Sequence, residues 1–499
     1  MQKTKKDILY FVIISFLFTL AFSIFQCVND DFLTHISRTY NLANSFRNGD
    51  FNPYMYQSCY FKYGYPFGIF YPDTFLKPFS FLIWMRIPIY TSMMFMLFCI
   101  NLATLFIPYF LLKKTEWNKE AFIISLIYFI YPYRFLDYAI RFSIGEVMFF
   151  VFFPFILYGL YKIFYKNEFS FGLFLGFWGI AHSHILSILL ILLFLIGFYL
   201  IQIKKWNLTL WKFTFINAVL VLISCIDVYL PILEAQFTED LLYEVNPAFM
   251  GELIENVIQI GETNIVLQII VFICICFLIY KIIKSKNIIL NSCFSLCILF
   301  LLITNLFPWE YFSVLNIIQF PFRFFVYGCI PWTLLVYKLN ILTKTHSSLR
   351  IECAKVFCII EILLTFAFAY VYDSYDFNRM YPNVGAGDYI NAKVDSYDLT
   401  FFEHNMNRDN NILTTKYFSE NGFLPIFYYG NYEVKKNGEL LDYVNKEGLL
   451  YIDELDDGWV SVYFKNTKLQ NISYIISIIS TIGIGIYIYK KERQFKTVI

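Results

Sequence analysis

The chain has 499 residues, of which 58% are hydrophobic and only 15% charged, with 59 Phe and 40 Tyr. This composition is too apolar for an ordinary soluble protein, so the sequence predicts an α-helical polytopic membrane protein. The formal net charge of +1 and the lack of any Lys/Arg-rich block in the sequence argue against nucleic acid as a partner.

Apolar stretches of membrane-spanning length recur along the chain. A helix needs about 20 largely apolar residues to cross a bilayer, and about twelve stretches meet or approach this length. They are residues 8–27, 88–112, 121–133, 147–165, 169–181, 185–203, 213–233, 265–283, 288–306, 324–336, 351–372 and 472–489. The sequence therefore predicts about twelve transmembrane helices.

The connections between these stretches predict the orientation of the chain. Lysines gather at both ends of the chain and in every second connection, which places both termini in the cytoplasm. Most arginines fall on the outer side, where a planar guanidinium suits recognition of phosphate. Either these arginines bind a phosphorylated lipid head group, or they pair with nearby acids and snorkel to outer-leaflet phosphates.

The first outer segment, residues 28–87, opens with the sequence DDFLTHISR. If Asp30 caps a helix that begins at Asp31, then positions 31, 35 and 38 share one helical face. This predicts an interfacial helix that presents Asp31, His35 and Arg38 together. A carboxylate near a helix N-terminus accepts a proton or binds a divalent cation. The simpler alternative is a capping acid with a local Asp–His pair.

A second cluster lies in residues 133–146, YRFLDYAIRFSIGE. Arg134, Asp137 and Arg141 share one face if this stretch is helical. Such a set either holds a phosphate or simply neutralises the buried acid, and the spacing does not separate these readings.

Two further outer motifs place polar residues beside apolar stretches. His182 and His184 in AHSHILS are two residues apart, so on a helix their rings point away from each other and a shared zinc site is not expected. One imidazole is expected to hydrogen-bond locally and the other to face a cavity. Gln319 and Arg323 in QFPFR lie at the outer start of a span, where an arginine must snorkel, pair or line a polar cavity.

The second outer segment, residues 373–470, is polar and rich in turn signals. Residues 422–434, 448–452 and 458–464 have the composition of strands and predict a small antiparallel β domain outside the membrane. The predicted organisation is a membrane region over residues 1–372, a mainly β extracytoplasmic domain over 373–470, and a last transmembrane helix with a cytoplasmic tail over 471–499.

Several of these motifs together resemble a known group of proteins. The chain resembles bacterial polytopic proteins labelled pyruvoyl-tetrahydropterin-synthase-related membrane proteins in the stretches DDFLTHISRTYNLANSFRNGDFNP, YGYPFGIFYPD, AHSHILS, QFPFR and VGAGDYI. It resembles the outer β domain of the YfhO-like membrane glycosyltransferases in LPIFYYGNYEVKKNGELL, GLLYI and GWVSVYF. Both groups are placed in the GT-C superfamily of glycosyltransferases.

The resemblance implies an enzyme that moves a hexosyl or pentosyl group from a polyprenyl-phosphate-linked donor to an extracytoplasmic glycan, cell-wall polymer or lipid, with inversion. The acid near the reacting centre in that superfamily matches Asp31 or Asp30 here, with Asp31 favoured by its helical face. The candidate residues for binding the substrate and its lipid-phosphate leaving group are His35, Arg38, Arg134, Arg141, His184, Gln319 and Arg323. Some members use a divalent cation such as Mg or Mn at the acidic loop and others do not, so Asp30 and Asp31 are also the candidate metal ligands.

Two other classes of function fit the sequence. A transporter or flippase of lipid-linked glycans is expected to carry charged or discontinuous helices near the bilayer midplane, whereas the polar residues here collect at the outer ends of the apolar stretches. A non-catalytic relative would use the β domain to bind glycan. In each case the expected location is the plasma membrane of a bacterium, among membrane lipids, with the site on the outer face.

Overall fold

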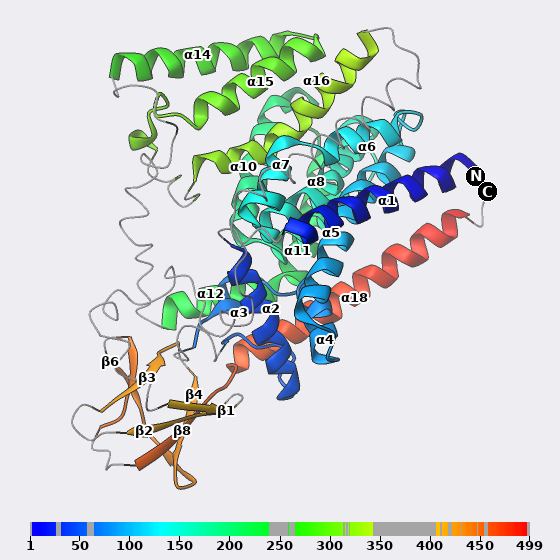
Figure 1. The fold of residues 1–499 in the computed structure, drawn as a ribbon. Coiled ribbons are helices and arrows are strands. Elements are labelled where there is room, and N and C mark those ends of the chain that lie inside the picture. The colour runs from blue at the N-terminus through cyan, green and yellow to red at the C-terminus, as the bar shows by residue number, and fades with distance from the viewer. Residues whose placement is uncertain are drawn as a thin grey trace.

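The computed structural model describes residues 2–25, 31–56, 64–238, 258, 265–312, 315, 318, 320–342, 406–409, 412–417, 422–429, 431–446, 448–453 and 458–496. The predicted span 351–372 and the motif VGAGDYI lie outside the described residues. Within the described residues the chain is mostly helical, and a small β region precedes the last helix (Figure 1).

The helices follow the apolar stretches in chain order. They are α1 (Gln2–Phe25), α2 (Phe32–Arg47), α3 (Phe67–Phe70), α4 (Lys77–Trp84), α5 (Ile89–Lys113), α6 (Ala121–Phe129), α7 (Pro132–Phe135), α8 (Ile144–Tyr161), α9 (Gly172–Ala181), α10 (Ile185–Ile201), α11 (Leu208–Ser224), α12 (Ile226–Thr238), α14 (Ile265–Lys284), α15 (Ile288–Leu302), α16 (Cys329–Leu342) and α18 (Lys468–Lys496). Shorter π- and 3₁₀-helical segments join them: η1 (Leu136–Arg141), η2 (Lys162–Lys166), η3 (Ile203–Lys205), η4 (Trp309–Tyr311) and η6 (Pro321–Gly328).

Five of the described helical segments are long and apolar enough to cross a membrane. They are Thr4–Ser23, Ile89–Lys113, Ile144–Lys166, Ile265–Lys284 and Lys468–Lys490, and the number rises to seven if each of two bent helix pairs forms one span. These helices are compatible with the predicted multi-pass membrane protein. The count of twelve stays a prediction, because helices such as α9, with 10 residues, rise only about 15 Å, half of an apolar bilayer core.

Two of the predicted spans are bent. Residues 121–133 divide between α6 and the α7–η1 segment, which meet at 51°. Tyr131, which precedes Pro132, takes an extended conformation because a residue before proline is disfavoured in a helix. The predicted span 213–233 is likewise broken, by 63° between α11 and α12. There the Ser224 hydroxyl donates to the Leu220 carbonyl at 2.8 Å, a contact that bends helices.

Helices α8 and α9 pack closely because glycines remove side chains from their interface. A Cβ added to Gly159 of α8 would lie 2.5 Å from the backbone nitrogen of Leu173, and one added to Gly172 of α9 would lie 2.6 Å from the Phe155 carbonyl oxygen. A Cβ on Gly179 would lie 2.1 Å from the Phe152 ring. Small residues permit this approach of helix backbones in membrane proteins.

Gly159→Ala is therefore expected to lower the free energy of unfolding by about 1–3 kcal/mol, the usual cost of overpacking. The measurement is detergent-induced or thermal unfolding of the purified chain. Gly197→Ala in α10 is the matched control, because nothing lies within 4 Å of the Cβ it adds. Equal effects of the two substitutions would contradict the packing argument.

The β region contains eight described strands in two antiparallel sheets. The strands are β1 (Met406–Asp409), β2 (Ile412–Tyr417), β3 (Phe423–Phe427), β4 (Tyr432–Lys436), β5 (Glu439–Leu441), β6 (Val444–Lys446), β7 (Leu449–Tyr451) and β8 (Gly458–Phe464). Their orders are β1-β2-β8-β4-β5 and β3-β7-β6. The predicted antiparallel strands near the C-terminus are confirmed, with one correction: residues 422–434 form two strands, one in each sheet.

The β region packs on the described part of the segment that runs from α2 to α4. Leu424 and Ile426 of β3 share one hydrophobic core with Tyr54, Ile69 and Phe70 of that segment. In Figure 1 the strands lie at the end of the molecule that holds α2, α3 and α4, while the start of α1 and the end of α18 lie at the opposite end. The described residues from α2 to α4 thus contact both the strands and the long apolar helix α5.

Candidate functional site

A polar cavity of about 190 Å³ lies where α2 and the segment after it meet the beginnings of several other helices. Its lining is Asp31, Thr34, His35, Arg38, Phe67, Tyr71, Arg141, Ser143, Gly145, Ser183, His184, Phe320 and Arg323. Among these are Asp31, His35, Arg38, Arg141, His184 and Arg323, all candidates from the sequence. The fold therefore brings residues from four separate motifs to one cavity.

Arg38 forms one wall of the cavity and is held by Asp73. Its Nη2 atom lies 2.8 Å from Asp73 Oδ1, and the other carboxylate oxygen of Asp73 accepts a hydrogen bond from the Tyr56 hydroxyl. The guanidinium carbon lies 5.5 Å from the centre of the Phe67 ring and 5.1 Å from that of Tyr71, within the range of cation–π attraction. Two aromatic rings therefore flank the arginine in the cavity wall.

Glu146 organises the opposite wall. This carboxylate is fully buried and accepts hydrogen bonds from Arg323 Nε at 2.8 Å, Arg141 Nη1 at 3.0 Å and the Tyr133 hydroxyl at 3.0 Å. Arg141 Nη1 also lies 2.8 Å from Asp137 Oδ1. Neither Glu146 nor Asp137 lines the cavity, whereas both arginines do. The carboxylates thus orient the guanidiniums from behind and leave them on the cavity surface.

Asp31 supplies the carboxylate at the cavity. It is the N-cap residue of α2, one position later than predicted, and its side chain makes no capping hydrogen bond. Its backbone nitrogen donates to the Arg141 carbonyl at 3.1 Å, which ties α2 to the end of η1. The predicted interfacial helix is enclosed on both faces, since Phe32 is 0% and Arg38 3% exposed, so its polar face lines a cavity rather than open solvent.

Three helix N-termini meet at the cavity. The lining includes the first residues of α2, Ser143 and Gly145 at the start of α8, and Ser183 and His184 at the start of α10. A helix N-terminus carries partial positive charge and unpaired N–H groups that favour anions. The turn into α8 is built by Phe142, whose backbone is left-handed (φ 57°) and whose ring packs 4.7 Å from that of Phe32.

The two cavity histidines are kept neutral. Burial, and then the charge of Arg38, lower the pKa of His35 well below its usual range. Burial, aided by three nearby arginines and opposed by Glu146, lowers the pKa of His184 to about 3. His184 Nδ1 lies 2.8 Å from the Ser187 hydroxyl. Its ring packs on the bare backbone of Gly145, where a Cβ would lie 3.0 Å from His184 Cδ2.

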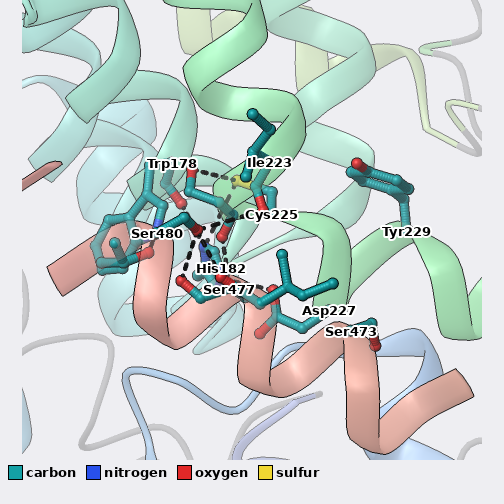
Figure 2. A network of polar contacts seen from close by, with 12 residues as sticks. Trp178, His182, Ile223, Cys225, Asp227, Tyr229, Ser473, Ser477 and Ser480 are labelled. Atoms are coloured by element: carbon teal, nitrogen blue, oxygen red, sulfur yellow. Dashed lines mark hydrogen bonds and ion pairs between the residues drawn. The ribbon is translucent and has the colours of Figure 1, made fainter. Parts of the chain in front are cut away.

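His182 takes the other role expected of the pair, that of a locally bonded imidazole. Figure 2 shows it at the end of α9, between the α11–α12 break and α18. Its Nδ1 atom lies 2.9 Å from the Trp178 carbonyl oxygen and its Nε2 atom 3.2 Å from Asp227 Oδ1. Burial disfavours the charged ring, but the contacts with Asp227 and Cys225 outweigh it and raise the pKa of His182 to about 10.

Arg134 is a candidate from the sequence that does not line the cavity. Arg134 points into the helical core, where its Nη2 atom donates to Asn101 Oδ1 at 2.6 Å and its guanidinium carbon lies 4.2 Å from the Phe129 ring centre. Arg134 therefore does not share one face with Asp137 and Arg141, as the spacing predicted. It lies in the helical core, whereas Arg141 lines the cavity. Asp30 and Gln319 lie outside the described residues.

Sequence reasoning missed Glu146 and Asp73 as site residues. Glu146 had a signal, because an acid within an otherwise apolar span is costly unless it is paired. Asp73 follows the aromatic stretch YGYPFGIFYP and carried no comparable signal.

The described residues do not suit a divalent cation. No group of three or more His, Cys, Asp and Glu that could hold a metal ion occurs among them. Asp31 supplies the one carboxylate among the described lining residues, beside three guanidiniums whose charge opposes that of a metal. The cavity favours an anion instead.

The chain matches no protein-family model, no curated protein and no solved structure.

Proposed function

We propose that this chain is a GT-C-type membrane glycosyltransferase that moves a sugar from a polyprenyl-phosphate-linked donor to an extracytoplasmic acceptor. The observation that carries the proposal is the composition of the cavity: three guanidiniums and three helix N-termini face a space that also contains the Asp31 carboxylate. Such a set can stabilise a phosphate leaving group and accept a proton, which are the two tasks of single-displacement sugar transfer.

In the proposed reaction Asp31 is the general base. Its carboxylate takes the proton of the acceptor hydroxyl while that oxygen bonds to the anomeric carbon of the sugar. The bond between this carbon and the donor phosphate oxygen breaks, and the electron pair stays on the phosphate. Arg141, Arg323 and Arg38 stabilise the charge that develops there. One displacement from the face opposite the leaving group inverts the anomeric configuration.

The proposal includes a chain of about twelve transmembrane helices with both termini in the cytoplasm and the cavity at the outer end. The positions of the two chain termini relative to the strands support this orientation. Helix α2, which carries His35 and Arg38, and the strands lie at one end of the described structure, away from the lysine-rich start of α1 and end of α18 (Figure 1). A lipid-borne phosphate at the outer surface would then meet the arginines.

The test is transfer of a labelled sugar from polyprenyl-phosphate donors by membranes that contain the wild-type chain or Asp31→Asn at equal amounts. Loss of the base is expected to reduce transfer about hundredfold or more. Glu168→Gln is the matched carboxylate-to-amide control, because Glu168 pairs with Lys162 at the far end of α8 and its side chain is 57% exposed.

The possible results separate the parts of the proposal. Full transfer by Asp31→Asn would remove Asp31 as the base. No transfer by the wild-type chain from hexosyl or pentosyl donors would overturn sugar transfer itself and favour a transporter.

A further inference from the structure

His184 is an imidazole held among fixed positive charges. Arg38 of α2, Arg141 of η1 and Arg323 of η6 line the same cavity, and Glu146 of α8 pairs with the latter two. The remaining titratable groups among the described lining residues are Asp31 and His35 of α2 and Tyr71, which follows α3. Burial and the guanidiniums outweigh the attraction of Glu146, so the pKa of His184 is lowered to about 3 and the ring is neutral near pH 7.

An anion in the cavity would raise the pKa of His184 again. A phosphate oxygen between the guanidiniums offsets the charge that disfavours a protonated imidazole, and it also accepts a hydrogen bond from that imidazole. His184 Nδ1 already lies 2.8 Å from the Ser187 hydroxyl, whose oxygen can accept the Nδ1 proton. The Nε2 proton of the charged ring is then available to the ligand in the cavity.

We propose that binding of a phosphate anion in this cavity is coupled to uptake of one proton by His184. This inference rests on the proposed function, because that function supplies the phosphate-bearing ligand. The proton stays with the protein during binding and no covalent bond is made or broken. Protonated His184 thereby adds a positive charge beside the bound anion and makes the affinity for anionic ligands depend on pH.

The sign of the pH dependence follows from linkage. The ligand-bound protein holds more protons than the free protein wherever the pH lies between the free and the bound pKa of His184. The affinity is therefore expected to rise as the pH falls toward 6, by up to about tenfold per pH unit between the free and the bound pKa. Without coupling, the affinity for a ligand of fixed charge would stay constant over this range.

The experiment is isothermal titration calorimetry on the full chain in lipid nanodiscs, with a short isoprenyl methyl phosphodiester as the probe. A phosphodiester keeps one negative charge between about pH 5 and pH 8, so any proton taken up belongs to the protein. The binding enthalpy is measured at about pH 6.5 in two buffers of different ionisation enthalpy, and its difference gives the number of protons. The expected number approaches one.

Two glutamine variants locate the proton. His184→Gln is expected to bind the probe without proton uptake and without pH dependence. His182→Gln is the matched control and should retain both, because His182 is already protonated by its contact with Asp227 and does not line the cavity.

The outcomes distinguish this inference from the proposed function. Binding by the wild-type chain without proton uptake, or uptake that persists in His184→Gln, would overturn the inference alone. Failure of the wild-type chain to bind the phosphodiester would overturn both the inference and the proposed phosphate site.

Discussion

Glu146→Ala is expected to lower the free energy of unfolding by about 3–5 kcal/mol, the cost of breaking a buried ion pair from one side. Glu146 is fully buried and forms an ion pair with both Arg141 and Arg323, while Arg141 also pairs with Asp137. Its removal leaves two guanidiniums in a poorly solvated place without that partner. The free energy is measured by denaturant or detergent titration of the purified chain.

Glu116→Ala is the matched control for this prediction. Glu116 also pairs with a cation, Lys166, and also accepts a hydrogen bond from a tyrosine, Tyr161, but its side chain is 60% exposed. Exposed ion pairs contribute little because water screens them and replaces the lost partner. No measurable loss of stability is therefore expected. A similar loss in both variants would show that burial is not the source of the effect at Glu146.

Local spacing made part of this site predictable from the sequence. Asp31, His35 and Arg38 lie within two helical turns, so the 3.6-residue period alone places them on one face. The same reasoning separated His182 from His184, and in the structure His182 lies against the Trp178 carbonyl four residues earlier while His184 lines the cavity. Each prediction needed only contacts within a single short segment.

The partners of the arginines could not be predicted in this way. Arg323 meets Glu146 across 177 positions of sequence, and Arg38 meets Asp73 across 35. Such pairs depend on how helices pack and on the bends between them, for example the 51° break after α6 that leads into η1. Helical periodicity carries no information on these angles, so Arg134 and Arg141 could not be assigned to different environments.

The pair of Arg38 and Asp73 carries the second large prediction. Asp73→Asn keeps an acceptor for the Tyr56 hydroxyl but removes the charge that faces Arg38, at a site where both side chains are 4% exposed. The free energy of unfolding is expected to fall by about 3 kcal/mol or more, because the guanidinium stays buried without its counter-charge.

Adding Arg38→Met to Asp73→Asn is expected to recover most of that loss. The double variant leaves no unpaired charge, and a methionine fills the space between the Phe67 and Tyr71 rings with favourable sulfur–aromatic contacts. Additive losses in the double-mutant cycle would refute a buried ion pair at this position. Under the proposed function, the recovered double variant should still bind the phosphodiester probe more weakly than the wild-type chain, since stability returns while one of the three guanidiniums at the cavity does not.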